Sequence, residues 1–150
     1  MLDHRPVLVV EDSDDDFDTV THAARLARLS NRLVRAIDAA DALDAITLHP
    51  QGFFAFVLLD YNLPGVDGLA FLYEIRLDCS ARQLPVVVLT TSVNPQDRDV
   101  FRDAGANAFH VKSVEHTECL RTLESIFERW LNVAAMPGDA VAAPRLEDSP

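Results

Sequence analysis

The stretch Val7-Leu8-Val9-Val10-Glu11-Asp12 opens the pattern that decides the fold of this 150-residue chain. It is the first of four short apolar runs that each stop at a polar residue. The other three are Phe56-Val57-Leu58-Leu59 before Asp60, Val86-Val87-Val88-Leu89 before Thr90, and Phe109-His110-Val111 before Lys112. Runs rich in valine and leucine are typical of parallel strands that are buried on both faces. Because ligands of open α/β sheets bind outside the carboxyl ends of the strands, the polar stop residues are predicted to share one rim.

Amphipathic stretches of helical length lie between these runs, and the alternation of strand and helix signals favours an α/β fold with a parallel sheet. Five strand and helix pairs are expected, the second strand covering residues 33–37. The helices are expected after Ser13, from about Ala40 to Leu48, after Asp67, from Asn94 to Gly105, and from about Val114 to Val133. Residues 1–133 are thus predicted to form one domain, and residues 134–150 a C-terminal tail or arm.

The acidic composition excludes some classes of partner. A formal net charge of -11 argues against binding to nucleic acid or to anionic membranes, because such a chain repels polyphosphates. The N-terminus lacks the apolar core of a signal peptide, and the longest apolar run, residues 53–59, is far too short to cross a membrane. A cytoplasmic protein is therefore expected. Cys79 and Cys119 have no metal-binding spacing and are interpreted as structural thiols.

The rim residues have complementary chemistry for handling a phosphoryl group. Magnesium prefers oxygen ligands, and Glu11, Asp12 and Asp60 supply carboxylates. A divalent cation that neutralises this cluster would let Asp60 attack an incoming phosphorus atom, since aspartate is a known nucleophile in phosphoryl transfer. Lys112 offers a positive charge and Thr90 a hydroxyl donor for the phosphoryl oxygens.

These residues stand in motifs that resemble the receiver domain of two-component response regulators. The motifs are Val-Glu-Asp at 10–12, Leu-Leu-Asp-Tyr-Asn-Leu-Pro at 58–64, Asp-Gly at 67–68, Thr90 and Lys112, and the resemblance covers about residues 6 to 131. It implies a doubly wound, five-stranded parallel sheet of flavodoxin-like (CheY-like) (βα)5 topology. It also implies a sensor histidine kinase as the phosphoryl donor.

The same resemblance assigns roles to individual residues. It makes Asp60 the phosphoacceptor, Asp12 the direct ligand of Mg²⁺, Glu11 a ligand through water, and the backbone carbonyl of Asn62 a third protein ligand. Thr90 becomes the switch hydroxyl and Phe109 the aromatic residue whose rotamer follows it, although an aromatic side chain in an edge strand is more often plain packing. The family usually has proline after the lysine, joined by a cis peptide, whereas Ser113 follows Lys112 here. Either that peptide is trans or the fold stores the cost of a non-proline cis bond.

A narrower resemblance concerns the C-terminal part. Val-Leu-Thr-Thr-Ser at 88–92, Phe-Glu-Arg-Trp-Leu-Asn-Val at 127–133 and Met136-Pro137 are similar to the single-domain regulators that partner bacterial phytochromes. This implies a phytochrome as the kinase and a homodimer with the terminal segment in its interface. The alternative is a final helix that packs Trp130 on its own sheet.

Other functions share parts of this pattern. An electron carrier of flavodoxin type would have the same architecture, but the acidic residues at 11–16 are unsuited to a flavin phosphate. A degenerate receiver that acts only as an interaction module would be expected to lack one of the acidic or lysine positions, and none is missing. A final-output switch and a phosphorelay intermediate both fit, and the downstream protein is not identified.

Overall fold

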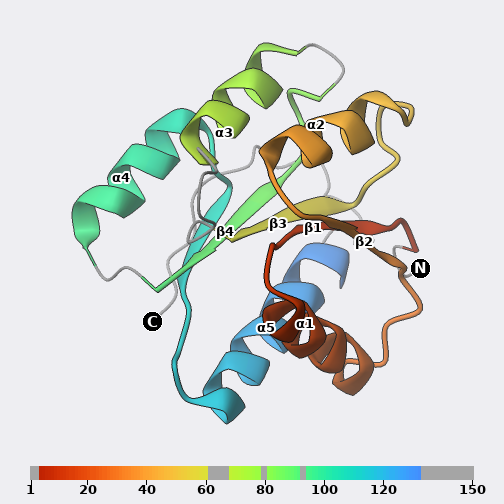
Figure 1. Ribbon diagram of the computed structural model, residues 1–150, viewed down its shortest axis with the longest axis vertical. Coiled ribbons are helices and arrows are strands. Elements are labelled where there is room, and N and C mark those ends of the chain that lie inside the picture. The colour runs from red at the N-terminus through yellow and green to blue at the C-terminus, as the bar shows by residue number, and fades with distance from the viewer. Residues whose placement is uncertain (1–3, 61–67, 79–80, 92–93, 133–150) are drawn as a thin grey trace.

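The sheet is parallel and five-stranded. The computed structural model describes residues 4–60, 68–78, 81–91 and 94–132 (Figure 1). The strands lie in the order β2-β1-β3-β4-β5, so the chain moves outward first to one edge of the sheet and then to the other. This is the predicted doubly wound, flavodoxin-like topology. The strands are β1 (Val7–Val10), β2 (Leu33–Ala36), β3 (Phe56–Asp60), β4 (Val86–Thr90) and β5 (Ala108–Val111).

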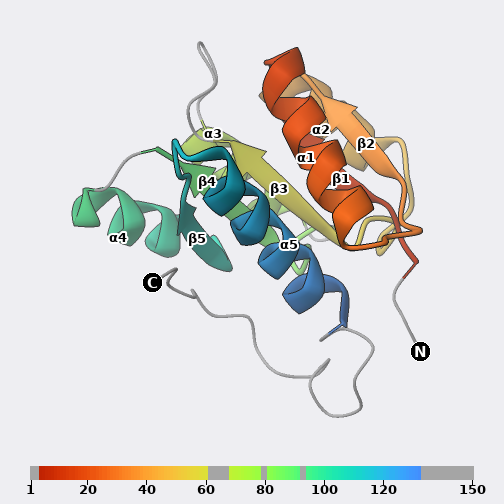
Figure 2. The ribbon, with the colours of Figure 1, turned by 90° about the horizontal axis from the view of Figure 1, so that it is seen from below.

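Helices cover both faces of this sheet and create two separate cores. One core contains side chains from the second, third and fourth helices, and the other contains side chains from the first and fifth. Figure 2 looks onto the face that the first and fifth helices cover. Because β1, β3 and β4 are buried on both faces, their apolar runs need no alternation with polar residues. The helices are α1 (Asp14–Leu26), α2 (Ala39–Thr47), α3 (Gly68–Leu77), α4 (Pro95–Ala104) and α5 (His116–Asn132).

Local sequence signals set the helix ends. The Ser13 hydroxyl caps α1 by accepting a hydrogen bond from the Asp16 backbone N–H, and the side chain of Asn94 caps α4. Gly105 ends α4 in the left-handed conformation, as predicted. Two helices begin at other residues than predicted. Asp38 caps α2, which begins at Ala39, and β2 before it ends at Ala36. The helix α5 begins at His116, because the Glu115 carboxylate accepts hydrogen bonds from N–H groups in its first turn.

The apolar residues of α5 are covered by the protein's own sheet. Phe127 and Leu131 are buried, and the Trp130 ring lies 6.4 Å from the ring of Phe56 in β3. The described part of α5 therefore fits the alternative in which the final helix packs Trp130 on its own sheet. Val133, Met136-Pro137 and the predicted arm at 134–150 lie outside the described residues, as do Asn62, Asp67 and Cys79. No helix in the described part of the chain combines the length and the apolar character needed to cross a membrane.

Candidate functional site

The parallel register brings the predicted stop residues to one rim of the sheet. Asp60 is the last residue of β3 and Thr90 the last of β4, while Glu11 and Lys112 follow β1 and β5 directly. Three residues of the rim are buried, at 3%, 6% and 0% exposure for Glu11, Asp60 and Thr90. Burial of two carboxylates is costly unless a cation or hydrogen bonds compensate it. Such a pair marks the rim as a site and distinguishes it from a solvated strand end.

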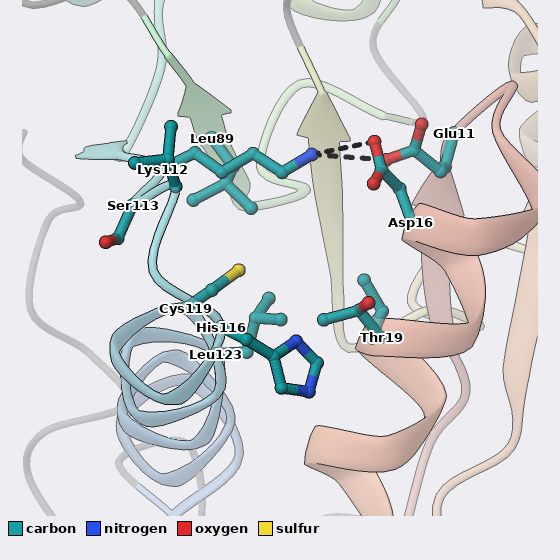
Figure 3. Close-up of a pocket in the computed structure, with 11 residues that line it drawn as sticks. Glu11, Asp16, Thr19, Leu89, Lys112, Ser113, His116, Cys119 and Leu123 are labelled. Atoms are coloured by element: carbon teal, nitrogen blue, oxygen red, sulfur yellow. Dashed lines mark hydrogen bonds and ion pairs between the residues drawn. The ribbon is translucent and has the colours of Figure 1, made fainter.

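The compensating cation is Lys112. Its Nζ atom lies 3.0 Å from Oδ2 of Asp16, 3.6 Å from Oδ2 of Asp60 and 4.0 Å from Oε1 of Glu11. Figure 3 shows the ammonium group reaching from the end of β5 across to α1. The backbone fixes the root of this side chain, because the Lys112 N–H donates to the carbonyl oxygen of Thr90. No cis peptide occurs among the described residues, so the bond between Lys112 and Ser113 is trans.

Crowding of negative charge shifts the acid-base properties of the rim. Burial, a side-chain hydrogen bond with Asp60 and the charge of Asp60 together raise the pKa of Glu11 to about 8. Burial alone would lower the pKa of Lys112, but the carboxylates of Asp60, Asp16 and Glu11 hold it above its ordinary value. The single positive charge of Lys112 does not balance the three carboxylates, so the cluster can still attract a further cation.

The geometry selects Asp16 in addition to the two predicted carboxylates. In the described part of the chain, Glu11, Asp16 and Asp60 form a group whose ligand oxygens all lie within 4.8 Å of one another. This all-oxygen set fits Mg²⁺, which is typically held by one or two carboxylates together with water and phosphate oxygens. The Asp12 side chain is exposed and is not part of this group, and Asn62 lies outside the described residues.

The predicted site residues do not include Asp16, whose backbone N–H donates to the Ser13 hydroxyl that caps α1. The signal for a second role was its position in the first turn of a helix that begins directly after the Glu11-Asp12 end of β1. The contact between Asp16 and Lys112 joins residues that are 96 positions apart, so no local sequence pattern could predict it.

The two predicted switch residues lie in β4 and β5, the strands on the Lys112 side of the sheet. Thr90 is fully buried at the end of β4. Phe109 is buried in β5, and its ring lies 5.9 Å from the ring of Phe101 in α4. Phe109 thus has a core role in this structure, and its rotamer switch stays a prediction.

A cavity of about 160 Å³ adjoins the cluster between α1 and the start of α5. Its lining includes the acidic residues Glu11 and Asp16, and also Lys112, Thr19 and Cys119 (Figure 3). Burial raises the pKa of the Cys119 thiol, which keeps it in the unreactive protonated form. This agrees with the interpretation of Cys119 as a structural thiol.

Comparison with known proteins places the fold and the rim in one family. Residues 7–124 match the response regulator receiver domain. The chain is 39% identical over 84 residues to the probable methanogenesis regulatory protein FilR2 of Methanothrix harundinacea, covering 56% of this chain and 54% of that protein. It is 35% identical over 81 residues to response regulator Rcp1 of Synechocystis, covering 54% of this chain and 55% of that protein. The alignments thus span about half the length of these curated relatives.

Similarity to solved structures extends further along the chain. The Mn²⁺-bound form of response regulator Rcp1 gives a TM-score of 0.78 at 28% identity, covering 89% of this chain and 99% of that one. The phosphorylated cyanobacterial phytochrome response regulator RcpA gives a TM-score of 0.80 at 29% identity, covering 90% of this chain and 99% of that one. These likenesses confirm the predicted resemblance to phytochrome response regulators. Since the family match runs from β1 into α5 and includes every strand of the rim, the chain belongs to the response regulator receiver domain family.

Proposed function

We propose that this protein is a single-domain response regulator that accepts a phosphoryl group on Asp60 from a sensor histidine kinase. The observation that carries the proposal is the buried Asp60 carboxylate at the end of β3, 3.6 Å from the ammonium group of Lys112. In the transfer, the phosphorus–nitrogen bond of a phosphohistidine breaks while a phosphorus–oxygen bond to Asp60 forms. The histidine nitrogen retains the bonding electron pair and takes up a proton. Lys112 then faces the new phosphoryl oxygens as a fixed positive charge.

Magnesium is the cofactor that this acidic rim fits. Asp60, Asp12, Glu11 through water and the backbone carbonyl of Asn62 are the proposed ligands. The solved Mn²⁺-bound form of Rcp1 supports a divalent cation in this family. When bound, Mg²⁺ supplies the positive charge that lets an anionic phosphoryl donor approach the clustered carboxylates.

The output of the proposed switch is a change in protein contacts. Thr90 turns its hydroxyl toward the phosphoryl group, and the rotamer of Phe109 follows it. The proposed activity is that of a phosphoacceptor, with no chemistry beyond self-catalysed phosphotransfer and autodephosphorylation. Both a final-output switch and a phosphorelay intermediate are compatible with this mechanism.

A phytochrome is the proposed kinase partner, and a homodimer the proposed assembly. The support for the kinase is the likeness to RcpA, which is a cyanobacterial phytochrome response regulator. The support for the dimer is the sequence resemblance over residues 127–137. We further propose a cytoplasmic location, where such a kinase domain would meet the protein.

The direct test is intact-mass spectrometry after incubation with acetyl phosphate and Mg²⁺. We expect the wild type to gain the mass of one phosphoryl group, and Asp60→Asn to gain none. Asp44→Asn is the matched control, because it removes the same charge from an exposed position on α2, and it should be labelled like the wild type. Asp12→Ala should abolish labelling as well. Labelling of Asp60→Asn, or full labelling without Mg²⁺, would contradict the proposal.

A further inference from the structure

The nearest anion to Lys112 is not the proposed phosphoacceptor. Asp16 accepts a hydrogen bond from Lys112 at 3.0 Å, whereas the contact to Asp60 is 3.6 Å long. A charged hydrogen bond of 3.0 Å is well formed, while a separation of 3.6 Å is only electrostatic. The ammonium group is thus turned toward α1 in this state, with its side chain only 16% exposed.

The position of Asp16 suits a side chain that can release its partner. Its Cα is fixed in the first turn of α1 by the backbone bond to the Ser13 hydroxyl, which does not involve the carboxylate. The carboxylate side chain is 44% exposed and borders the cavity between α1 and α5, so it can turn without displacing packed atoms. The neighbouring Asp14 binds Arg35 at 2.7 Å and faces a different partner.

We propose that Asp16 is a positioning residue that holds Lys112 in the unphosphorylated state and competes with the phosphoryl group for its ammonium. The inference rests on the proposed phosphorylation of Asp60. A phosphoryl group carries about two negative charges where the carboxylate carried one, so it draws Lys112 away from Asp16. The hydrogen bond to Asp16 opposes this movement, and it therefore weakens the modified state relative to the resting state.

The test is the affinity of the protein for beryllofluoride, a phosphoryl mimic, measured by calorimetry in saturating Mg²⁺. Asp16→Asn should bind it about two- to fivefold more tightly than the wild type, the range that a partly exposed ion pair carries. Asp15→Asn is the matched control, since it removes the same charge from the same helical turn and leaves the contact with Lys112 in place. It should differ from the wild type by less than about twofold. Asp16→Glu keeps the charge and should stay near the wild type.

A double-mutant cycle shows whether Asp16 acts through Lys112. In a Lys112→Gln background, Asp16→Asn should no longer tighten binding. A gain in affinity that persists there would mean direct repulsion between Asp16 and the mimic, and would overturn the inference.

A separate Mg²⁺ titration without beryllofluoride tests whether Asp16 is a metal ligand. If Asp16→Asn lost far more affinity for Mg²⁺ than Asp15→Asn, Asp16 would be a metal ligand, and the inference would also be overturned. A wild type that neither binds beryllofluoride nor accepts phosphate would refute the proposed function itself. Binding by the wild type with an unchanged Asp16→Asn would refute only the role of Asp16.

Discussion

At the scale of single residues, the site is organised around one ammonium group and three carboxylates. Lys112 contacts Asp16, Asp60 and Glu11, and each carboxylate comes from a different place in the chain. Two of the three carboxylates are buried. Each carboxylate lowers the free-energy cost of burying the ammonium group, but it raises the cost of burying the other carboxylates, because like charges repel. Burial is the main cause of the raised pKa of Glu11, at about 8, and the neighbouring Asp60 raises it further.

His110 is a further titratable residue whose environment matters. Its side chain in β5 is partly buried, and that burial lowers its pKa below the ordinary 6.5. The unfolded chain therefore binds more protons than the folded protein once the pH falls below about 6.5. The contribution of this residue to the free energy of unfolding is fully present above that pH and is lost as the pH falls from there through the lower pKa of the folded state.

We predict that His110→Gln removes this component of the acid sensitivity. The difference in free energy of unfolding between wild type and variant should be constant above about pH 6.5 and should shift against the wild type below it. Urea denaturation at several pH values from neutral to mildly acidic measures the difference. His116→Gln, which removes an imidazole from an exposed position on α5, is the control. Parallel curves for wild type and His110→Gln would contradict the prediction.

At the scale of elements, Arg76 locks the edge of the sheet opposite the rim. From α3 its guanidinium donates to the carbonyl oxygens of Gly105 and Leu84 and to the side-chain oxygen of Asn107. That same Asn107 oxygen accepts from the backbone N–H of Val86 at the start of β4. The C-terminal end of α4 is thus tied to α3 and to β4.

The glycine at this junction gives an element-scale prediction. Gly105 has a φ of 108°, and a Cβ atom there would lie 2.8 Å from Cγ of Arg76. Gly52 also has a positive φ, 81°, but a Cβ atom would meet nothing within 4 Å. Gly52→Ala should therefore cost only the backbone strain, about 1 kcal/mol. Gly105→Ala should cost about 1–3 kcal/mol more, because the packed Arg76 must move. Urea denaturation of the two variants measures both losses, and equal losses would show that the Arg76 contact adds nothing.

At the scale of the whole molecule, the structure changes how the proposed dimer must be tested. Truncation after Phe127 would remove Leu131, which is buried, and Trp130, which packs near Phe56. Such a chain would lose part of its own core. A loss of dimers would then report unfolding and not a missing interface.

We therefore predict the behaviour of a chain that ends at Asn132, the last residue of α5. It should keep the melting temperature of the full chain within a few degrees, because the described core is intact, and it should still accept phosphate at Asp60. If the segment after Asn132 contributes to the dimer interface, light scattering at micromolar concentration should give a dimeric mass for the full chain and a monomeric mass for the shortened one. A monomeric full chain, with or without phosphorylation, would refute the dimer.

The sequence alone determined the sheet, the rim and the proposed phosphoacceptor. Continuous apolar runs define buried parallel strands, and the carboxyl ends of parallel strands must meet at one edge, so Glu11, Asp60, Thr90 and Lys112 were placed together without coordinates. The helix caps at Ser13 and Asn94 could also be predicted from the sequence, because they involve hydrogen bonds between residues only two or three apart.

Only the tertiary structure decided which groups touch across that rim and at the opposite edge. The pairing of Lys112 with Asp16, the contacts of Arg76 with Gly105, and the cover of Trp130 by Phe56 join residues far apart in sequence. Such contacts depend on the angle at which each helix crosses the sheet and on the rotamers that packing allows, and neither is encoded in a local pattern. The pKa of Glu11 likewise follows from burial beside Asp60, a property that arises only when β1 and β3 lie side by side.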